Sequence, residues 1–170
     1  MIKCPPSLYA KTCYKSVVPR IVIAIGLPGS GKSTYLRSLG VNPISSDAIR
    51  LQLADDASIQ TINGYVFATM RYLIRRRLAL RRPVTYVDAT HLTVAERAPY
   101  VAIARAFGCE LEALFFDVPV EICQERNRAR QRFVPPEAIE LMKTKLVPPT
   151  IEEGFTHVTV LKPDPDSRTT

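Results

Sequence analysis

The chain has 170 residues, 46% of them hydrophobic and 23% charged, so it can bury one core, and a wholly disordered protein is excluded. Its charge is unusual, because 23 Lys and Arg residues stand against 16 Asp and Glu residues and leave a net +7. Most of the basic residues are Arg, whose guanidinium binds phosphate through two parallel hydrogen bonds. Such a surplus favours a polyanionic partner, although an ordinary basic surface gives the same total.

Nothing in the sequence predicts secretion, membrane insertion or a zinc site. The N-terminal residues lack the apolar core of a signal peptide, and no stretch approaches the roughly 18 apolar residues of a membrane span. The 4 cysteines show no CxxC spacing, and the 2 histidines lie far apart. We therefore expect a cytoplasmic protein without a membrane partner.

The N-terminal half predicts an arm followed by alternating strands and helices. Three prolines make residues 1–19 an extended N-terminal arm. A β-branched run predicts a buried strand at 20–25, and a helix at 33–39 ends before Gly40. A short strand or loop at 42–46 precedes a helix over 48–53 that Asp47 can cap. A long helix follows at 61–80, and its predicted apolar face consists of Val66, Met70, Leu73, Ile74 and Leu78.

The C-terminal half continues the alternation. After a strand at 84–88, Thr93 and Glu96 form a capping-box pattern that opens a helix to Phe107. The remaining predicted elements are a strand at 110–117, helices at 119–132 and 135–145, a strand at 157–161 and a polar tail at 163–170. This order predicts an α/β fold in one domain, residues 20–162, with a parallel sheet of about five strands covered by helices on both faces.

The segment GLPGSGKST at 26–34 carries the strongest chemical signal. It matches GxxxxGK[ST] between a predicted strand and a predicted helix, which is the context that the motif requires. The glycines let backbone N–H groups approach phosphate oxygens, Lys32 can reach the β- and γ-phosphates, and Ser33 can place its hydroxyl on Mg²⁺. We therefore expect ATP, or alternatively GTP, with Mg²⁺, bound by Gly26, Pro28, Gly29, Ser30, Gly31, Lys32, Ser33 and Thr34.

Two acidic residues follow strands and are candidates for chemistry. Asp47 lies at the carboxyl edge of the predicted sheet, where it can accept the proton of an attacking hydroxyl, and Arg50 shares its helix face and can hold an acceptor phosphate. The alternative is an N-cap Asp and a surface Arg. Asp88 can bind Mg²⁺ or orient Ser33, or it can simply cap a turn. We interpret His91 as a residue on the rim of the site.

Two groups of arginines have less certain roles. Arg126 and Arg130 are four residues apart in the predicted 119–132 helix, so they share a face and can offset charge on the donor phosphates from a lid at about 124–146. A solvated basic helix gives the same pattern. A second cluster, for which a nucleic-acid surface and a solvated face are equally good interpretations, consists of Arg71, Arg75, Arg76, Arg77, Arg81 and Arg82.

The chain resembles the P-loop polynucleotide 5′-hydroxyl kinases from about Ile21 to Leu161. Five blocks carry the resemblance: GLPGSGKST (26–34), SSDAIR (45–50), VTYVDATHL (84–92), FFDVPVEICQERNRAR (115–130) and FVPPEAIELM (133–142). It implies transfer of the γ-phosphate of ATP to a 5′-OH of RNA or DNA, with Asp47 as general base and Arg50 on the neighbouring phosphate. Lys32 and Arg130 are the other predicted catalytic residues, and Arg126 and Arg130 the lid arginines. At the position of His91, similar sequences often have Asn.

Two other functions remain open from the sequence. A small-molecule kinase would use the same fold for a sugar, nucleoside or antibiotic acceptor. A nucleotide-switch module would bind the triphosphate without an acceptor. The sequence does not distinguish RNA from DNA or ATP from GTP, and it does not indicate the oligomeric state.

Overall fold

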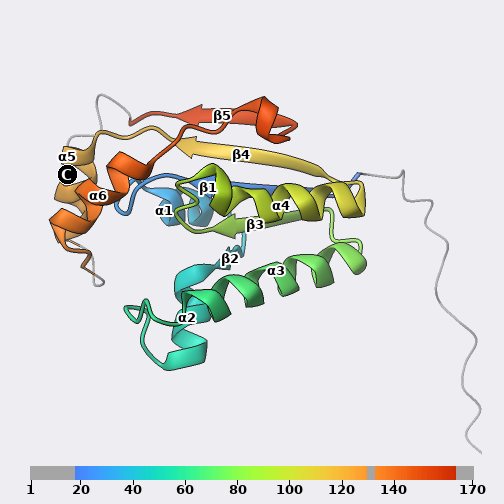
Figure 1. Cartoon of the computed structure of the whole chain (residues 1–170), viewed down its shortest axis with the longest axis horizontal. Coiled ribbons are helices and arrows are strands. Elements are labelled where there is room, and N and C mark those ends of the chain that lie inside the picture. The colour runs from blue at the N-terminus through green and yellow to red at the C-terminus, as the bar shows by residue number, and fades with distance from the viewer. Residues whose placement is uncertain (1–17, 130–132, 164–170) are drawn as a thin grey trace, which may run out of the picture.

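In the computed structural model, which describes residues 18–129 and 133–163, the strands form one parallel sheet (Figure 1). They are β1 (Arg20–Ile25), β2 (Ile44–Ser45), β3 (Val84–Asp88), β4 (Glu110–Phe116) and β5 (His157–Leu161), and the five lie in the order β2-β3-β1-β4-β5. The predicted α/β fold is confirmed. The predicted arm at 1–19 and tail at 163–170 lie, except for residues 18, 19 and 163, outside the described residues.

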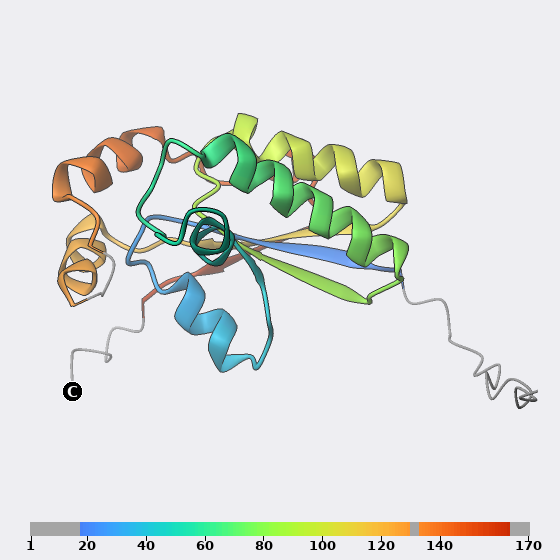
Figure 2. The same ribbon diagram turned by 90° about the horizontal axis from the view of Figure 1, so that it is seen from below.

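Helices cover both faces of the sheet (Figure 2). One face is covered by α1 (Lys32–Ser38), and the other by α3 (Asn63–Ala79) and α4 (Val94–Phe107). The remaining helices, α2 (Ser46–Ala54), α5 (Val120–Arg128) and α6 (Pro136–Lys145), gather where the strands end, and a 3₁₀ turn, η1 (Ile151–Glu153), precedes β5. No helix in the described part of the chain is long and apolar enough to span a bilayer.

Burial follows the predicted patterns closely. In the central strand β1, every residue after Arg20 is buried, which accounts for its continuous apolar run. In α3 the buried residues recur at helical spacing and are Val66, Met70, Ile74 and Leu78. Leu73, predicted for the same face, is 37% exposed because its position lies beside that stripe. The apolar face of α3 is therefore narrower than predicted.

The boundaries of two helices differ from prediction. The N-cap of α2 is Ser45, whose Oγ accepts a hydrogen bond from the Ala48 N–H, so the prediction that Asp47 is the cap is wrong. Ser45 also pairs with β3, and α2 begins at Ser46, two residues earlier than predicted. The helix predicted at 119–132 is too long, because α5 ends at Arg128.

The strand register aligns the segments that follow three strands. Asp88, the last residue of β3, is opposite Ala24 of β1 and opposite Ser45 of β2. The phosphate loop after β1 and the first turn of α2 therefore begin at the level of Asp88. Parallel strands produce such an alignment because all of them end at the same edge.

A buried arginine that the sequence analysis did not single out connects α4 with the segment after α6. Arg97 is 0% exposed and donates from Nε and Nη2 to the two carboxylate oxygens of Glu153, at 2.8 and 2.6 Å. Its Nη1 donates to the carbonyl oxygens of His91, Leu92 and Val147. The guanidinium thus holds the loop after β3 against the chain that leaves α6.

Loss of this arginine should destabilise the fold. Arg97→Met leaves the Glu153 carboxylate, 9% exposed, without its counter-ion, and we expect the free energy of unfolding in urea to fall by about 3–5 kcal/mol. Arg20→Met is the control, because Arg20 pairs with Glu112 at 3.4 Å while 43% exposed and should cost less than about 1 kcal/mol. Equal losses for the two variants would contradict a structural role for the buried pair.

Candidate active site

The residues predicted to bind the donor and the acceptor line a single cleft of about 640 Å³ at the carboxyl edge of the sheet. This volume lies in the usual range for a small-molecule site. The predicted residues in its wall are Pro28, Gly29, Gly31, Lys32, Ser33, Thr34, Asp47, Arg50, Asp88 and Arg126. Gly26 and Ser30, which belong to the same loop, are buried and do not line the cleft. Arg130 lies outside the described residues.

The phosphate loop closes around the ammonium group of Lys32. Lys32 is 7% exposed, and its Nζ donates to the carbonyl oxygens of Gly26 and Leu27 at 2.9 and 2.7 Å. A third contact, at 3.3 Å, is with Ser30 Oγ. A full positive charge is therefore held in the concave side of the loop.

The loop also packs tightly against α5. Gly29 has a φ of 84°, and a Cβ at this position would collide with the carbonyl oxygen of Cys123. On the same side, Nη1 of Arg126 lies 3.9 Å from the place that a Cβ on Gly31 would occupy. The close approach at Gly29 thus brings the Arg126 guanidinium over the loop.

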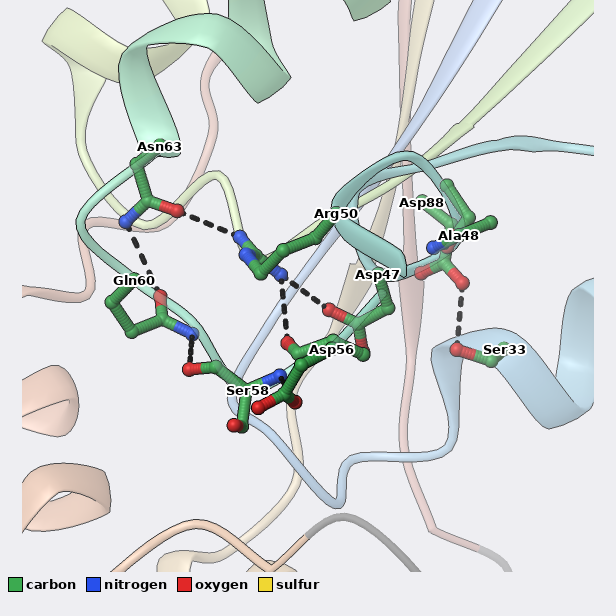
Figure 3. Close-up of polar contacts among 11 residues, drawn as sticks. Ser33, Asp47, Ala48, Arg50, Asp56, Ser58, Gln60, Asn63 and Asp88 are labelled. Carbon is green, nitrogen blue, oxygen red and sulfur yellow. Dashed lines mark hydrogen bonds and ion pairs between the residues drawn. The ribbon is translucent and has the colours of Figure 1, made fainter. Parts of the chain in front are cut away.

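Ser33 and Asp88 form an oxygen pair between the loop and β3. The Ser33 hydroxyl donates to Asp88 Oδ2 at 2.6 Å, and Asp88 is 7% exposed (Figure 3). A hydroxyl and a carboxylate fit Mg²⁺, which prefers oxygen ligands and takes most of its shell from water and substrate phosphates. Within residues 18–129 and 133–163, no cluster of three or more His, Cys, Asp or Glu residues is arranged to hold a metal by itself.

Asp47 and Arg50 contact each other on α2. Arg50 Nη1 donates to Asp47 Oδ1 at 2.9 Å, and Nη2 donates to the Asn63 side chain at 2.7 Å (Figure 3). The Arg50 side chain is only 4% exposed, whereas that of Asp47 is 40% exposed toward solvent. The arginine is therefore fixed in the cleft wall, and the carboxylate is presented to whatever enters. Asn63 lies in that wall too, and no motif in the sequence singled it out.

The prediction that His91 lies on the rim of the site is wrong. The residue is 1% exposed, has a φ of 48°, and its Nδ1 lies 2.8 Å from the carbonyl oxygen of Ala24. Because a carbonyl only accepts, Nδ1 carries the proton in this bond. Burial, with smaller contributions from the positive charges of Lys32 and Arg97, lowers the pKa of His91 to about 4. The ring packs edge-to-face on Tyr100 and is a neutral core residue beneath the cleft.

This buried histidine should make the fold sensitive to acid. The unfolded chain binds the His91 proton below about pH 6.5 and the folded chain only below about 4, so stability should fall by up to about 3 kcal/mol as the pH drops through this window. His91→Asn removes the titrating group, and Asn tolerates a positive φ. Denaturant titrations at several pH values should therefore show that the free energy of unfolding changes less steeply with pH in this variant than in the wild type. A wild-type slope in His91→Asn would contradict the assignment.

The contact between the loop and α5 allows a second test. Gly29→Ala adds both a strained φ and a collision with Cys123, whereas Gly40→Ala adds only the strain, because Gly40 has a φ of 67° and open space around it. Gly40→Ala should cost about 1–2 kcal/mol, and Gly29→Ala about 1–3 kcal/mol more. Urea unfolding of the two variants measures the difference, and equal costs would show that α5 does not pack on the loop.

Comparisons with known proteins identify the family. A family model described as an AAA domain matches residues 21–149, so the chain belongs to this family, and its neighbours place it among the P-loop kinase-like members. It is 27% identical over 151 residues to the bifunctional polynucleotide phosphatase/kinase of Schizosaccharomyces pombe. The aligned region covers 85% of this chain and 34% of that protein. The resemblance inferred from the five sequence blocks is confirmed.

Solved structures agree on the fold. A chain of the Pnkp1/Rnl/Hen1 RNA repair complex superposes with a TM-score of 0.65 at 26% identity, over 81% of this chain and 46% of that chain. A sugar kinase from Janibacter sp. HTCC2649 superposes with a TM-score of 0.61 at 19% identity, over 85% of each chain. The chain therefore spans less than half the length of the S. pombe protein and of the RNA repair chain, and a sugar kinase has the same fold.

Proposed function

We propose that the protein is an ATP- and Mg²⁺-dependent polynucleotide 5′-hydroxyl kinase. The observation that supports this most is the single cleft, because the phosphate loop and the exposed Asp47 carboxylate line it together. Phosphoryl transfer needs the donor phosphate and the acceptor hydroxyl in line and close, and catalysis comes mostly from positioning and charge.

The donor side supplies positive charge to the triphosphate. In this proposal, Lys32 exchanges its bonds to loop carbonyls for bonds to phosphate oxygens, and Arg126 contacts the same oxygens from α5. Both cations then offset the charge that develops during transfer. Ser33 and Asp88 would hold Mg²⁺, which when bound bridges the phosphates and neutralises part of their charge.

The acceptor side supplies a base. Asp47 accepts the proton of the attacking hydroxyl through its exposed carboxylate oxygens, while Arg50 holds that carboxylate in place at 2.9 Å. Arg50 is largely enclosed, so its contact with an acceptor phosphate would be made through the part of the guanidinium that faces the cleft. In this proposal, α5 and α6 supply the lid predicted at about 124–146, and the Gln124 side chain, which donates to Glu140 at 2.6 Å, joins the two helices.

A polynucleotide acceptor is supported by the net charge of +7 and by the names of the two relatives of highest identity described above. A sugar or nucleoside acceptor is the second candidate, because the sugar kinase matches 85% of the chain.

The two candidate acceptors are distinguished by incubating the protein with γ-labelled ATP and Mg²⁺. One reaction contains a 5′-OH oligonucleotide, RNA or DNA, and the other contains a panel of sugars and nucleosides. Label in the oligonucleotide supports the proposal, and label only in a metabolite contradicts it. A parallel reaction with GTP tests the donor.

The base can be tested with a matched pair of variants on α2. Asp47→Asn keeps the shape of the side chain but removes the acceptor of the proton, so kcat should fall by about 100-fold or more. Binding of ATP should change by less than about twofold, since Asp47 is assigned to the other substrate. Asp55→Asn is the control, because Asp55 caps the far end of the helix with a φ of 56°, which Asn also adopts. Equal rates for the two variants would exclude Asp47 as the base.

A further inference from the structure

The outer face of α3 carries an exposed stripe of aromatic and basic side chains. Tyr65, Tyr72 and Arg76 are seven and four residues apart, so they lie along one side of the helix. Tyr65 is 74% exposed and Tyr72 is 53% exposed, although tyrosine is usually at least half buried. The Arg76 guanidinium lies 5.0 Å from the centre of the Tyr72 ring. We call these three residues the α3 stripe.

The segment that carries the stripe has side-chain charges of one sign. No Asp or Glu occurs between residues 57 and 87, a segment that contains all of α3 and β3 up to Asp88. Of the six arginines in it, Arg77 is used structurally, because it donates to the Thr85 hydroxyl and the Val84 carbonyl oxygen. Arg75, Arg76, Arg81 and Arg82 are exposed. The face therefore complements a polyanion, and its aromatic rings are available for stacking.

The stripe begins next to the cleft and leads away from it. Asn63 and Phe67, in the first turns of α3, line the cleft that also contains Asp47. At 3.6 residues per turn they lie on the opposite side of the helix from Tyr65 and Tyr72, so the stripe shares the end of α3 with the cleft but not the face. With a rise of about 1.5 Å per residue, Arg76 lies about 20 Å along the helix from Asn63 and about 14 Å from Phe67. Figure 2 shows that α3 runs from the carboxyl edge of the sheet toward the opposite end. A chain molecule with one end in the cleft therefore reaches the stripe by crossing the first turns of α3, and it can then follow the outer face of the helix.

We propose that the α3 stripe binds the single-stranded polynucleotide whose 5′ end enters the cleft, an inference that rests on the proposed function. Tyr65 and Tyr72 stack on bases, and Arg76 contacts phosphates together with Arg75, an exposed neighbour of the stripe on the same helix. Proteins that bind single strands without reading sequence combine these two elements, a basic track and exposed aromatic faces. A basic surface alone would account for the arginines but not for two exposed tyrosines in line with them.

Binding to a 3′-labelled oligonucleotide of about 12 nucleotides, as DNA and as RNA, tests the inference without ATP. Tyr72→Ala should weaken binding by at least about fivefold, because stacking on an aromatic side chain contributes this much per base. Arg75→Gln with Arg76→Gln should lower the slope of log K against log salt by about 1.4, since each phosphate contact on a single strand contributes about 0.7. Arg37→Gln is the matched control, an exposed arginine on α1 across the sheet, and should leave affinity within about twofold.

A second readout links the stripe to catalysis. The ratio of kcat/KM for the 12-mer to kcat/KM for a nucleoside 3′-monophosphate, which is too short to reach the stripe, should fall about fivefold or more in Tyr72→Ala. If the short acceptor is phosphorylated and the ratio does not change, the stripe is excluded while the proposed function stands. If the oligonucleotide binds through the stripe but no acceptor is phosphorylated, the proposed function is contradicted, and the stripe is still supported as an oligonucleotide-binding surface.

Heparin, a polyanion without bases, distinguishes a strand surface from a merely basic one. Tyr72→Ala should leave heparin binding unchanged while weakening oligonucleotide binding. If Tyr72→Ala has no effect on the oligonucleotide, or if Arg37→Gln weakens it as much as the stripe variants do, the face is an ordinary basic surface and the inference is overturned.

Discussion

The site depends on the register of three parallel strands. Because Asp88 is opposite both Ala24 and Ser45, the segments that follow β1 and β2 start at the level of the carboxylate that ends β3. The phosphate loop, Asp47 and the Ser33–Asp88 hydrogen bond are consequences of that alignment. A slip by one residue would turn every side chain of a strand to the other face and separate the three segments.

The other wall of the cleft depends on two contacts outside the sheet. The absence of a Cβ at Gly29 lets α5 pack against the phosphate loop, and this brings Arg126 over it. Arg97 binds the loop after β3 and the carbonyl oxygen of Val147, and the Val147 N–H donates to the carbonyl oxygen of Leu92 at 2.9 Å. The helix α5 is therefore attached to the phosphate loop, and the segment after α6 is attached to the loop after β3. In our account, this is what keeps donor and acceptor within reach of each other.

Local patterns predicted what depends on local chemistry. The apolar runs of β1 and β3 and the Pro135–Pro136 start of α6 are fixed within a few residues of sequence, and all three were predicted correctly. The cap of α2 was not, because Ser45 and Asp47 are both good caps and only the pairing of β2 with β3 selects the serine. The burial of His91 and the role of Arg97 depend on packing between segments far apart in the chain, and neither residue type has a periodicity that reveals it. The Asp47–Arg50 contact was predictable from helical spacing, whereas the bond from Arg50 to Asn63 required the packing of α2 on α3.

The position of the transferred phosphate tests the central claim most directly. After reaction of a 5′-OH oligonucleotide with γ-labelled ATP, complete nuclease digestion of the product to 5′-monophosphates shows which nucleotide carries the label. Our account predicts that all label is recovered in the 5′-monophosphate of the first nucleotide, and that an acceptor already phosphorylated at its 5′ end takes up none. Label on an internal or 3′-terminal nucleotide, or an unlabelled oligonucleotide beside a labelled sugar or nucleoside, would contradict it.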